Sequence, residues 1–191
     1  MTQQAKGLAR AHDSTLVVLD MQTRAAAALQ PPAFARVCET TARILRAAEV
    51  LAVPVIYTEH GAPSLGVTDP RIVNALPGSA YRVIKSMYCA WADDGFCNAV
   101  EIAARQQIIL CGLQAHVGIV QTAIALAENN YQVFVVADGI GSHDPALAAD
   151  AVERMRANTV TITSCESLLY EWTEGSDATS REHILSILHE T

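Results

Sequence analysis

The chain has 191 residues, 51% of them hydrophobic, and its thirteen Lys and Arg against twenty Asp and Glu give a net charge of −7. This length suits one well-buried core, so we expect a single domain over residues 1–191. No apolar run reaches the roughly 20 residues that span a bilayer, and the start does not resemble a signal peptide. These features favour a cytoplasmic protein with no membrane partner, and the acidic balance argues against nucleic acid.

The five cysteines are odd in number, widely spaced and without a Cys-x-x-Cys pair: Cys38, Cys89, Cys97, Cys111 and Cys165. This pattern makes disulfides or a zinc–thiolate site improbable. We expect each thiol to be a small buried hydrophobe.

In chain order, short β-branched runs bounded by turn residues predict strands buried on both faces. They lie at residues 15–19, 53–58, 107–110, 132–137 and 160–163. The stretches between them are rich in Ala and Leu and carry apolar residues at helical spacing, which predicts crossover helices. These lie at residues 37–51, 94–104, 118–128 and 145–157. The alternation predicts a doubly wound α/β fold with a mainly parallel sheet and helices on both faces.

Three further segments complete the expected organisation. Residues 82–84 read as a further short strand, and residues 166–172 and 180–189 read as two C-terminal helices. The longest irregular piece is 60–82, where Gly and Pro interrupt any regular period. Loops of that length in a compact domain are often functional.

Polar residues follow several of the predicted strands. Asp20 comes directly after the first strand, His60 after the second, and Lys85 and Tyr88 after residues 82–84. Ligands of open parallel sheets bind beyond the carboxyl ends of the strands, so we expect these side chains to converge. A carboxylate beside an ammonium is suited to proton transfer. The alternative is that Asp20 caps the next helix and that Lys85 is an ordinary surface lysine.

The ordered blocks LVVLDMQ, VPVIYTEH, VIKSMYCAWAD, IILCGLQAHVGIVQTAIAL and VFVVADGIGS resemble the isochorismatase-like cysteine hydrolases. Within that superfamily the chain is most similar to the isochorismatase-domain-containing branch. The resemblance implies a Rossmann-like three-layer fold and a catalytic triad of Asp, Lys and Cys. Asp20 matches the acid or base and Lys85 the lysine, whereas Gly118 stands at the position of the nucleophilic cysteine.

Gly118 leaves three interpretations of the function open. True isochorismatases also carry glycine after an Ala-His-Val or Ala-His-Ile sequence; their aspartate protonates an enol carbon of a vinyl ether, and water attacks the oxocarbenium ion. Asp20 would then be the general acid, with Lys85 assisting it and binding a substrate carboxylate. Alternatively, the chain is a natural or engineered ligand-binding protein without turnover. In the third interpretation Cys89 or Cys111 replaces the nucleophile, although neither begins a helix that would activate a thiol.

The resemblance also implies an oxyanion site. A cis peptide at Gln114–Ala115 would turn the amides of Val117 and Gly118 toward the substrate. The expected substrate-contacting residues are Val117, Ala115, His60, Tyr88 and Trp91. His116 is expected to be a structural residue at the sheet edge rather than a general base.

No metal or cofactor is expected. Nicotinamidases of the superfamily carry Asp-x-His near the second strand, but this chain has Thr58, Glu59 and His60 there. Glu59 and His60 would point apart on an extended strand, which disfavours a joint metal site. The resemblance implies a small-molecule substrate, and together with the apolar C-terminal helices it implies a homo-oligomer.

Overall fold

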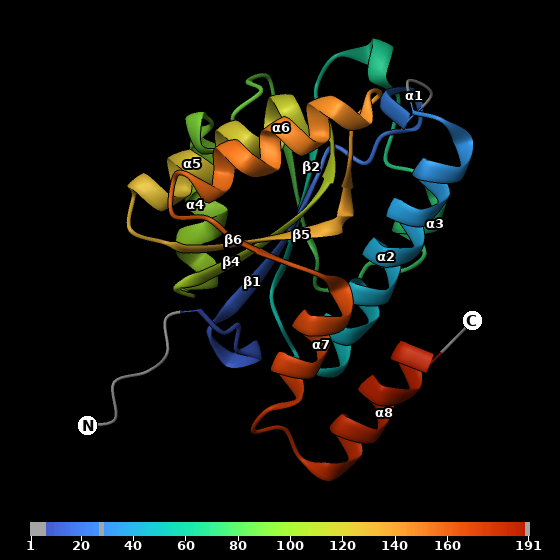
Figure 1. Ribbon diagram of the computed structural model, residues 1–191, viewed down its shortest axis with the longest axis vertical. Helices are drawn as coiled ribbons and strands as arrows, with labels where there is room; N and C mark the ends of the chain where they lie inside the picture. Colours follow the sequence, from blue (N-terminus) through green and yellow to red (C-terminus); the bar gives the residue numbers. More distant parts are fainter. Residues whose placement is uncertain (1–6, 27–28, 190–191) are drawn as a thin grey trace.

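The computed structural model describes residues 7–26 and 29–189, and its centre is a six-stranded sheet (Figure 1). The strand order is β3-β2-β1-β4-β5-β6, and every neighbouring pair is parallel. The strands are β1 (Ser14–Leu19), β2 (Val55–His60), β3 (Tyr81–Lys85), β4 (Gln107–Leu113), β5 (Gln132–Gly141) and β6 (Thr161–Thr163). The parallel sheet expected from the sequence is confirmed.

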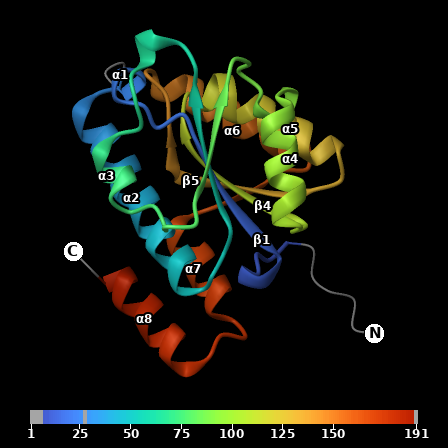
Figure 2. The ribbon, with the colours of Figure 1, turned by 180° about the vertical axis from the view of Figure 1, so that it is seen from behind.

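Helices connect the strands and cover both faces of the sheet (Figures 1 and 2). The helices are α1 (Thr23–Ala26), α2 (Pro31–Val50), α3 (Pro70–Val73), α4 (Asp94–Ala103), α5 (Val120–Glu128), α6 (Pro145–Arg156), α7 (Cys165–Thr173) and α8 (Ala178–His189). Helices α2, α3, α7 and α8 contribute to one hydrophobic core, and α4, α5 and α6 to the other. The expected three-layer α/β fold is therefore confirmed.

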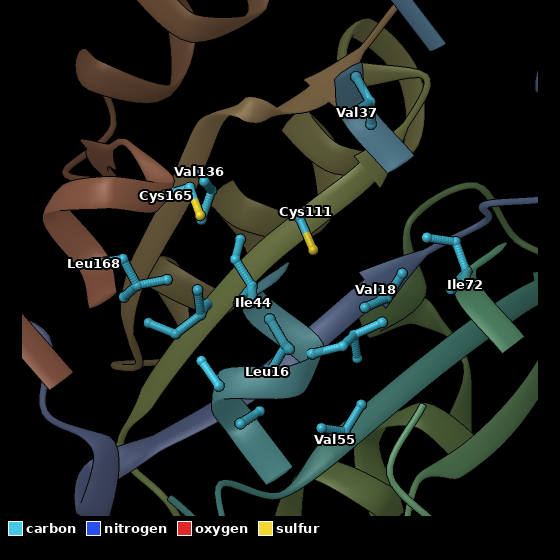
Figure 3. Close-up of a cluster of buried hydrophobic side chains, with 14 of the residues drawn as sticks. Leu16, Val18, Val37, Ile44, Val55, Ile72, Cys111, Val136, Cys165 and Leu168 are labelled. Atoms are coloured by element: carbon cyan, nitrogen blue, oxygen red, sulfur yellow. The ribbon is translucent and has the colours of Figure 1, made fainter. Parts of the chain in front are cut away.

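Strand β1 shows why the sheet is buried on both sides. Leu16 and Val18 belong to the core under α2, whereas Val17 and Leu19 belong to the core on the opposite face. Figure 3 shows Leu16 and Val18 among the buried side chains beside Ile44 of α2. Burying each such side chain contributes about 1.5–3 kcal/mol relative to exposure. An uninterrupted apolar strand of this kind is stable only at the centre of a covered sheet.

Strands β4 and β5 extend further at their carboxyl ends than predicted. The sequence predicted strands ending at residues 110 and 137, but β4 continues to Leu113 and β5 to Gly141. Gly112 adopts φ +135, and a Cβ there would stand 2.1 Å from the Leu19 carbonyl oxygen. Glycine therefore continues strand β4 past a close approach to β1.

Two smaller differences concern the segments around the sheet edge. The helix expected from residue 118 begins at Val120, because Ala115–Ile119 form a π-helical turn first. The irregular stretch 60–82 contains the short helix α3 and the first residues of β3. Among the helices of the described residues, none is long and apolar enough to cross a membrane.

Candidate active site

An ion pair lies at the carboxyl edge of the sheet. Lys85 Nζ donates a hydrogen bond to Asp20 Oδ2 over 2.6 Å, although the two residues are 65 positions apart in the chain. The Lys85 side chain is 0% exposed and that of Asp20 is 15% exposed. The Lys85 ammonium is thus shielded from solvent, whereas the Asp20 carboxylate remains accessible to it. The structure brings together the two residues that the sequence singled out for proton transfer.

The Asp20 backbone is held in an uncommon conformation. Its φ of 51 lies in the left-handed region, which costs a residue with a Cβ roughly 1–2 kcal/mol. Thr58 on β2 stabilises this arrangement, because its Oγ1 donates to Asp20 Oδ1 over 2.6 Å. The Asp20 N–H in turn donates to the Thr58 carbonyl oxygen over 3.2 Å. Asp20 does not cap α1, which begins at Thr23; its carboxylate is bonded to Thr58 and Lys85 instead.

Lys85 has a second acceptor in the loop that follows β3. Its Nζ donates to the Met87 carbonyl oxygen over 3.1 Å. A buried ammonium is stable only when paired and hydrogen-bonded, and Asp20 and Met87 supply both. The surface-lysine interpretation is therefore wrong, since the side chain is fully buried.

Gly118 lies opposite this pair. A Cβ atom added at Gly118 would lie 3.9 Å from Asp20 Oδ2 and 3.2 Å from the Tyr88 carbonyl oxygen. A side chain at position 118 would therefore point into the space beside the Asp20 carboxylate. Strands β1, β3 and the turn after β4 thus converge on one point.

The alternation along β2 separates His60 from Glu59. His60 is paired in register with Lys85, and its ring stacks on that of Tyr88 with centroids 5.5 Å apart. Glu59 turns away and accepts hydrogen bonds from the backbone N–H and the hydroxyl of Thr68. The two side chains point apart, as expected for neighbours on a strand. His60 and Tyr88 form an aromatic pair beside the ion pair.

The segment 61–69, which we call the strap, is tied to the sheet edge. Buried Gln22 donates through Nε2 to the carbonyl oxygens of His60 and Gly66, and its Oε1 accepts the His60 N–H. The Asp69 N–H donates to the Met21 carbonyl oxygen over 2.8 Å. The strap is therefore held against the sheet edge by hydrogen bonds rather than being a free loop.

The turn after β4 differs from the expected oxyanion site. The Gln114–Ala115 peptide bond is trans, so the cis bond implied by the resemblance is wrong for this chain. Gln114 instead reverses the chain with a left-handed φ of 59, and the Val117 N–H donates to the Gln114 carbonyl oxygen over 2.8 Å. The Val117 N–H is therefore already hydrogen-bonded within the turn. Ala115 is fully buried and its carbonyl oxygen accepts the Val120 N–H.

Two predicted residues lie away from the ion pair. Trp91 packs edge to face against Tyr131, with centroids 5.5 Å apart, at the core under α4 and α5. His116 Nδ1 lies 2.9 Å from Ser142 Oγ, and its ring contacts that of His143. Burial, with the neighbouring His143, lowers the pKa of His116 below its usual 6.5. These contacts agree with a structural role for His116.

The buried thiols are poor replacements for a nucleophile. Burial raises the pKa of Cys111 to about 12, of Cys165 to about 12 and of Cys38 to about 11. Within residues 7–26 and 29–189, no group of three or more His, Cys, Asp or Glu side chains is placed to hold a metal ion.

The fold and the site define a class of α/β protein with a doubly wound parallel sheet and, at the carboxyl edge of that sheet, an aspartate paired with a buried lysine. The isochorismatase domain model matches residues 14–167, so the chain belongs to the isochorismatase family.

Curated relatives cover most of the chain. Isochorismatase domain-containing protein 2 of Danio rerio is 27% identical over 177 residues, covering 92% of this chain and 86% of its own. The secreted isochorismatase effector Isc1 of Phytophthora sojae is 29% identical over 164 residues, covering 84% and 77%.

Solved structures show the same fold. The MAR1 ribonuclease of Caenorhabditis elegans superposes with a TM-score of 0.88 at 24% identity, covering 96% of this chain and 93% of its own. YcaC from Pseudomonas aeruginosa, solved with hexane-2,5-diol and covalent acrylamide, gives 0.84 at 21% identity and covers 97% and 93%.

Some contributors to the site were not identified from the sequence. Thr58 was read only as part of a strand, and the Met87 contact is made by a carbonyl group that any residue would supply. Gln22 stands two residues after Asp20 in the LDMQ block, and that proximity was the one available signal.

Proposed function

We propose that the chain is a small-molecule hydrolase whose reacting proton is carried by Asp20 and Lys85, and that Gly118 occupies the position that holds the nucleophile in cysteine-containing relatives. The observation that carries this proposal is the 2.6 Å contact between Lys85 Nζ and Asp20 Oδ2, with Gly118 directed at the same carboxylate. Glycine provides no sulfur, so the reaction proceeds without a thioester or any other covalent intermediate at this position.

The reaction that fits these residues is vinyl-ether hydrolysis. Asp20 takes a proton from Lys85 over the 2.6 Å contact and passes it to the enol carbon. Water then attacks the oxocarbenium carbon, and the proton that it releases returns through Asp20 to Lys85. The resulting hemiketal collapses to a ketone and an alcohol. His60 and Tyr88 flank the substrate on the side of the strap.

A ligand-binding protein without turnover is the second candidate. The observation that favours it is the Val117 N–H, which donates to Gln114 within the turn and is withdrawn from any oxyanion. Losing one oxyanion donor costs about 10²–10³ in the rate of acyl transfer. Such a chain would bind the relatives' substrates and release them unchanged.

An activity panel separates the candidates. The native protein, Asp20→Ala and Gly118→Cys are each assayed on isochorismate and on a set of amides. Native hydrolysis of isochorismate that is abolished in Asp20→Ala supports the acid mechanism. Amidase activity found only in Gly118→Cys identifies a degraded cysteine hydrolase. Binding of isochorismate without turnover by the native protein assigns the ligand-binding role and overturns the proposed reaction.

The remaining expectations concern binding partners, oligomeric state and cellular location. With a net charge of −7, the substrate is a small molecule rather than a nucleic acid, and incubation with labelled RNA should leave the RNA intact. A homo-oligomer in the cytoplasm remains our proposal. It is supported by exposed apolar side chains on β3 and the adjoining loop, Tyr81, Ile84, Met87 and Tyr88, and by the octamer described for YcaC of Escherichia coli.

A further inference from the structure

A serine and a histidine meet at the carboxyl ends of β4 and β5. His116 lies in the turn after β4 and Ser142 follows β5, and Ser142 Oγ lies 2.9 Å from His116 Nδ1. The two strands are neighbours in the sheet, and Leu113 pairs with Gly141 at their ends. This register brings together two side chains that are 26 positions apart in the chain. The reaction proposed for Asp20 and Lys85 uses neither of them.

The protonation state of His116 suits a general base. Burial, with the neighbouring His143, lowers the pKa of His116 below its usual 6.5, so the imidazole is neutral at pH 7. In the tautomer with its proton on Nε2, the lone pair of Nδ1 accepts the hydroxyl hydrogen of Ser142. A serine hydroxyl bonded to such a nitrogen is the arrangement that activates an oxygen nucleophile. The contact by itself also fits a structural role, so the surroundings of Ser142 decide between the two roles.

Ser142 separates His116 from a cavity of about 440 Å³ between α2 and the carboxyl end of β5. Ser142 lines this cavity whereas His116 does not, so the base lies behind the serine. Ser142 is 8% exposed, and a molecule bound in the cavity would contact it directly. Pro145, the first residue of α6, lines the same cavity. The beginning of a helix favours negative charge, and an oxyanion formed at the attacked carbonyl would lie there.

The walls of the cavity indicate an uncharged ligand. Leu29, Val37 and Ile140 supply an apolar part that suits a short hydrocarbon chain. The volume is at the small end of the range of about 300–1,000 Å³ for ligand pockets. The formal charges of the lining residues cancel, since two are positive and two are negative: Arg36, Arg43, Glu39 and Asp138.

We propose that Ser142 is the nucleophile of a second hydrolytic site, that His116 is its general base, and that its substrates are esters with a small uncharged acyl group. This site is separate from the Asp20 site and does not depend on the reaction proposed there. Isochorismate carries no ester and is not a substrate of it.

The reaction balances in atoms and charge. Ser142 Oγ forms a bond to the ester carbonyl carbon while His116 Nδ1 takes the hydroxyl proton. The bond from that carbon to the leaving oxygen then breaks, and the leaving alkoxide receives the proton from His116. A water molecule attacks the acyl-serine, His116 takes the proton of this water, and the proton returns to Ser142 Oγ as the carboxylic acid leaves. The net reaction is the addition of one water molecule to the ester.

Labelling of the native protein with an alkyl fluorophosphonate tests the nucleophile without any variant. Ser142 Oγ would displace fluoride from phosphorus and keep the alkyl phosphonate. We expect one adduct per chain in the folded protein, located at Ser142 by peptide mapping, and none in denaturant. A folded protein that stays unlabelled, or that carries the label on another residue only, would overturn the proposal.

Turnover of p-nitrophenyl butyrate tests the two roles. Ser142→Ala should abolish hydrolysis, and His116→Asn should lower kcat at least about 100-fold, since asparagine can bond the hydroxyl but cannot take its proton. Ser79→Ala is the matched control, because Ser79 is an exposed serine on the wall of another cavity, and it should retain native kinetics. Circular dichroism checks that the variants fold. A folded His116→Asn protein with native kcat would assign His116 a structural role and overturn the proposal, as would native activity in Ser142→Ala.

Discussion

At the scale of single residues, Asp20 is held in position from three sides. Its backbone is left-handed with φ 51, Thr58 bonds one carboxylate oxygen and Lys85 bonds the other. Strained backbone of this kind persists where the surroundings enforce it, and such residues cluster at functional sites. A fixed carboxylate of this kind suits the proposed reaction, in which Asp20 acts first as an acid and then as a base.

Thr58→Val tests this positioning. Removing the hydroxyl takes one hydrogen bond from a charged acceptor, which is worth about 1.5–3 kcal/mol, so we expect kcat to fall about 10- to 100-fold. Thr58→Ser keeps the hydroxyl and should recover most of the rate. A Thr58→Val enzyme as fast as the native one would show that this bond does not position Asp20. Steady-state kinetics on the substrate identified by the activity panel provide the measurement.

The cysteines give a second prediction at this scale. Because burial raises the pKa of Cys38 to about 11 and those of Cys111 and Cys165 to about 12, these thiols are protonated at pH 7. Titration of the native protein with a thiol reagent should leave all three unmodified until denaturant is added. Rapid labelling of Cys111 in the folded protein would contradict this account and reopen a thiol mechanism.

At the scale of elements, the strap depends on Gln22. Its side chain makes three hydrogen bonds that join the segment after β1 to β2 and to the strap. Gln22→Leu should lower the free energy of unfolding by about 2–4 kcal/mol and speed hydrogen exchange in residues 61–69, because backbone groups lose buried partners. Exposed Gln30→Leu is the matched control. Unchanged exchange in the strap would contradict the assigned role.

The elements also show which features the sequence could predict. β1 and the start of β4 were predictable, because their apolar runs fit only a sheet covered on both faces. The turn at Ala115–Ile119 was not, because Gln114 has a left-handed backbone there although no glycine or asparagine signals it in the sequence. Asp20 and Lys85 were found by position at the sheet edge, but Thr58 and Gln22 could be assigned only once the register of β1 and β2 was known.

At the scale of the whole molecule, stability should fall in acid. His116 has a lowered pKa in the folded protein, so the unfolded chain takes up its proton first, and stability falls as the pH drops below about 6.5 toward the folded value. The hydrogen bond from Arg71 lowers the pKa of Asp69, so its contribution is present above about 3.8 and is lost as the pH falls further.

Urea midpoints measured between pH 8 and pH 3 test these signs. As the pH falls, the urea midpoint of the native protein should decrease below about pH 6.5 and again below about pH 3.8. His116→Asn should reduce the decrease below about pH 6.5 and leave the decrease below about pH 3.8 unchanged. A midpoint that rises between pH 7 and pH 5.5 would contradict the assignment to His116, provided that the unfolding slope stays constant.

The central claim is that hydrolysis at Asp20 and Lys85 needs no covalent intermediate. Intact-protein mass spectrometry of samples quenched during turnover of isochorismate tests it most directly, with Gly118→Cys and an amide as the positive control for an adduct. We predict that product accumulates while the native protein keeps its unmodified mass at every time point. A transient increase in protein mass equal to a substrate fragment would contradict the claim.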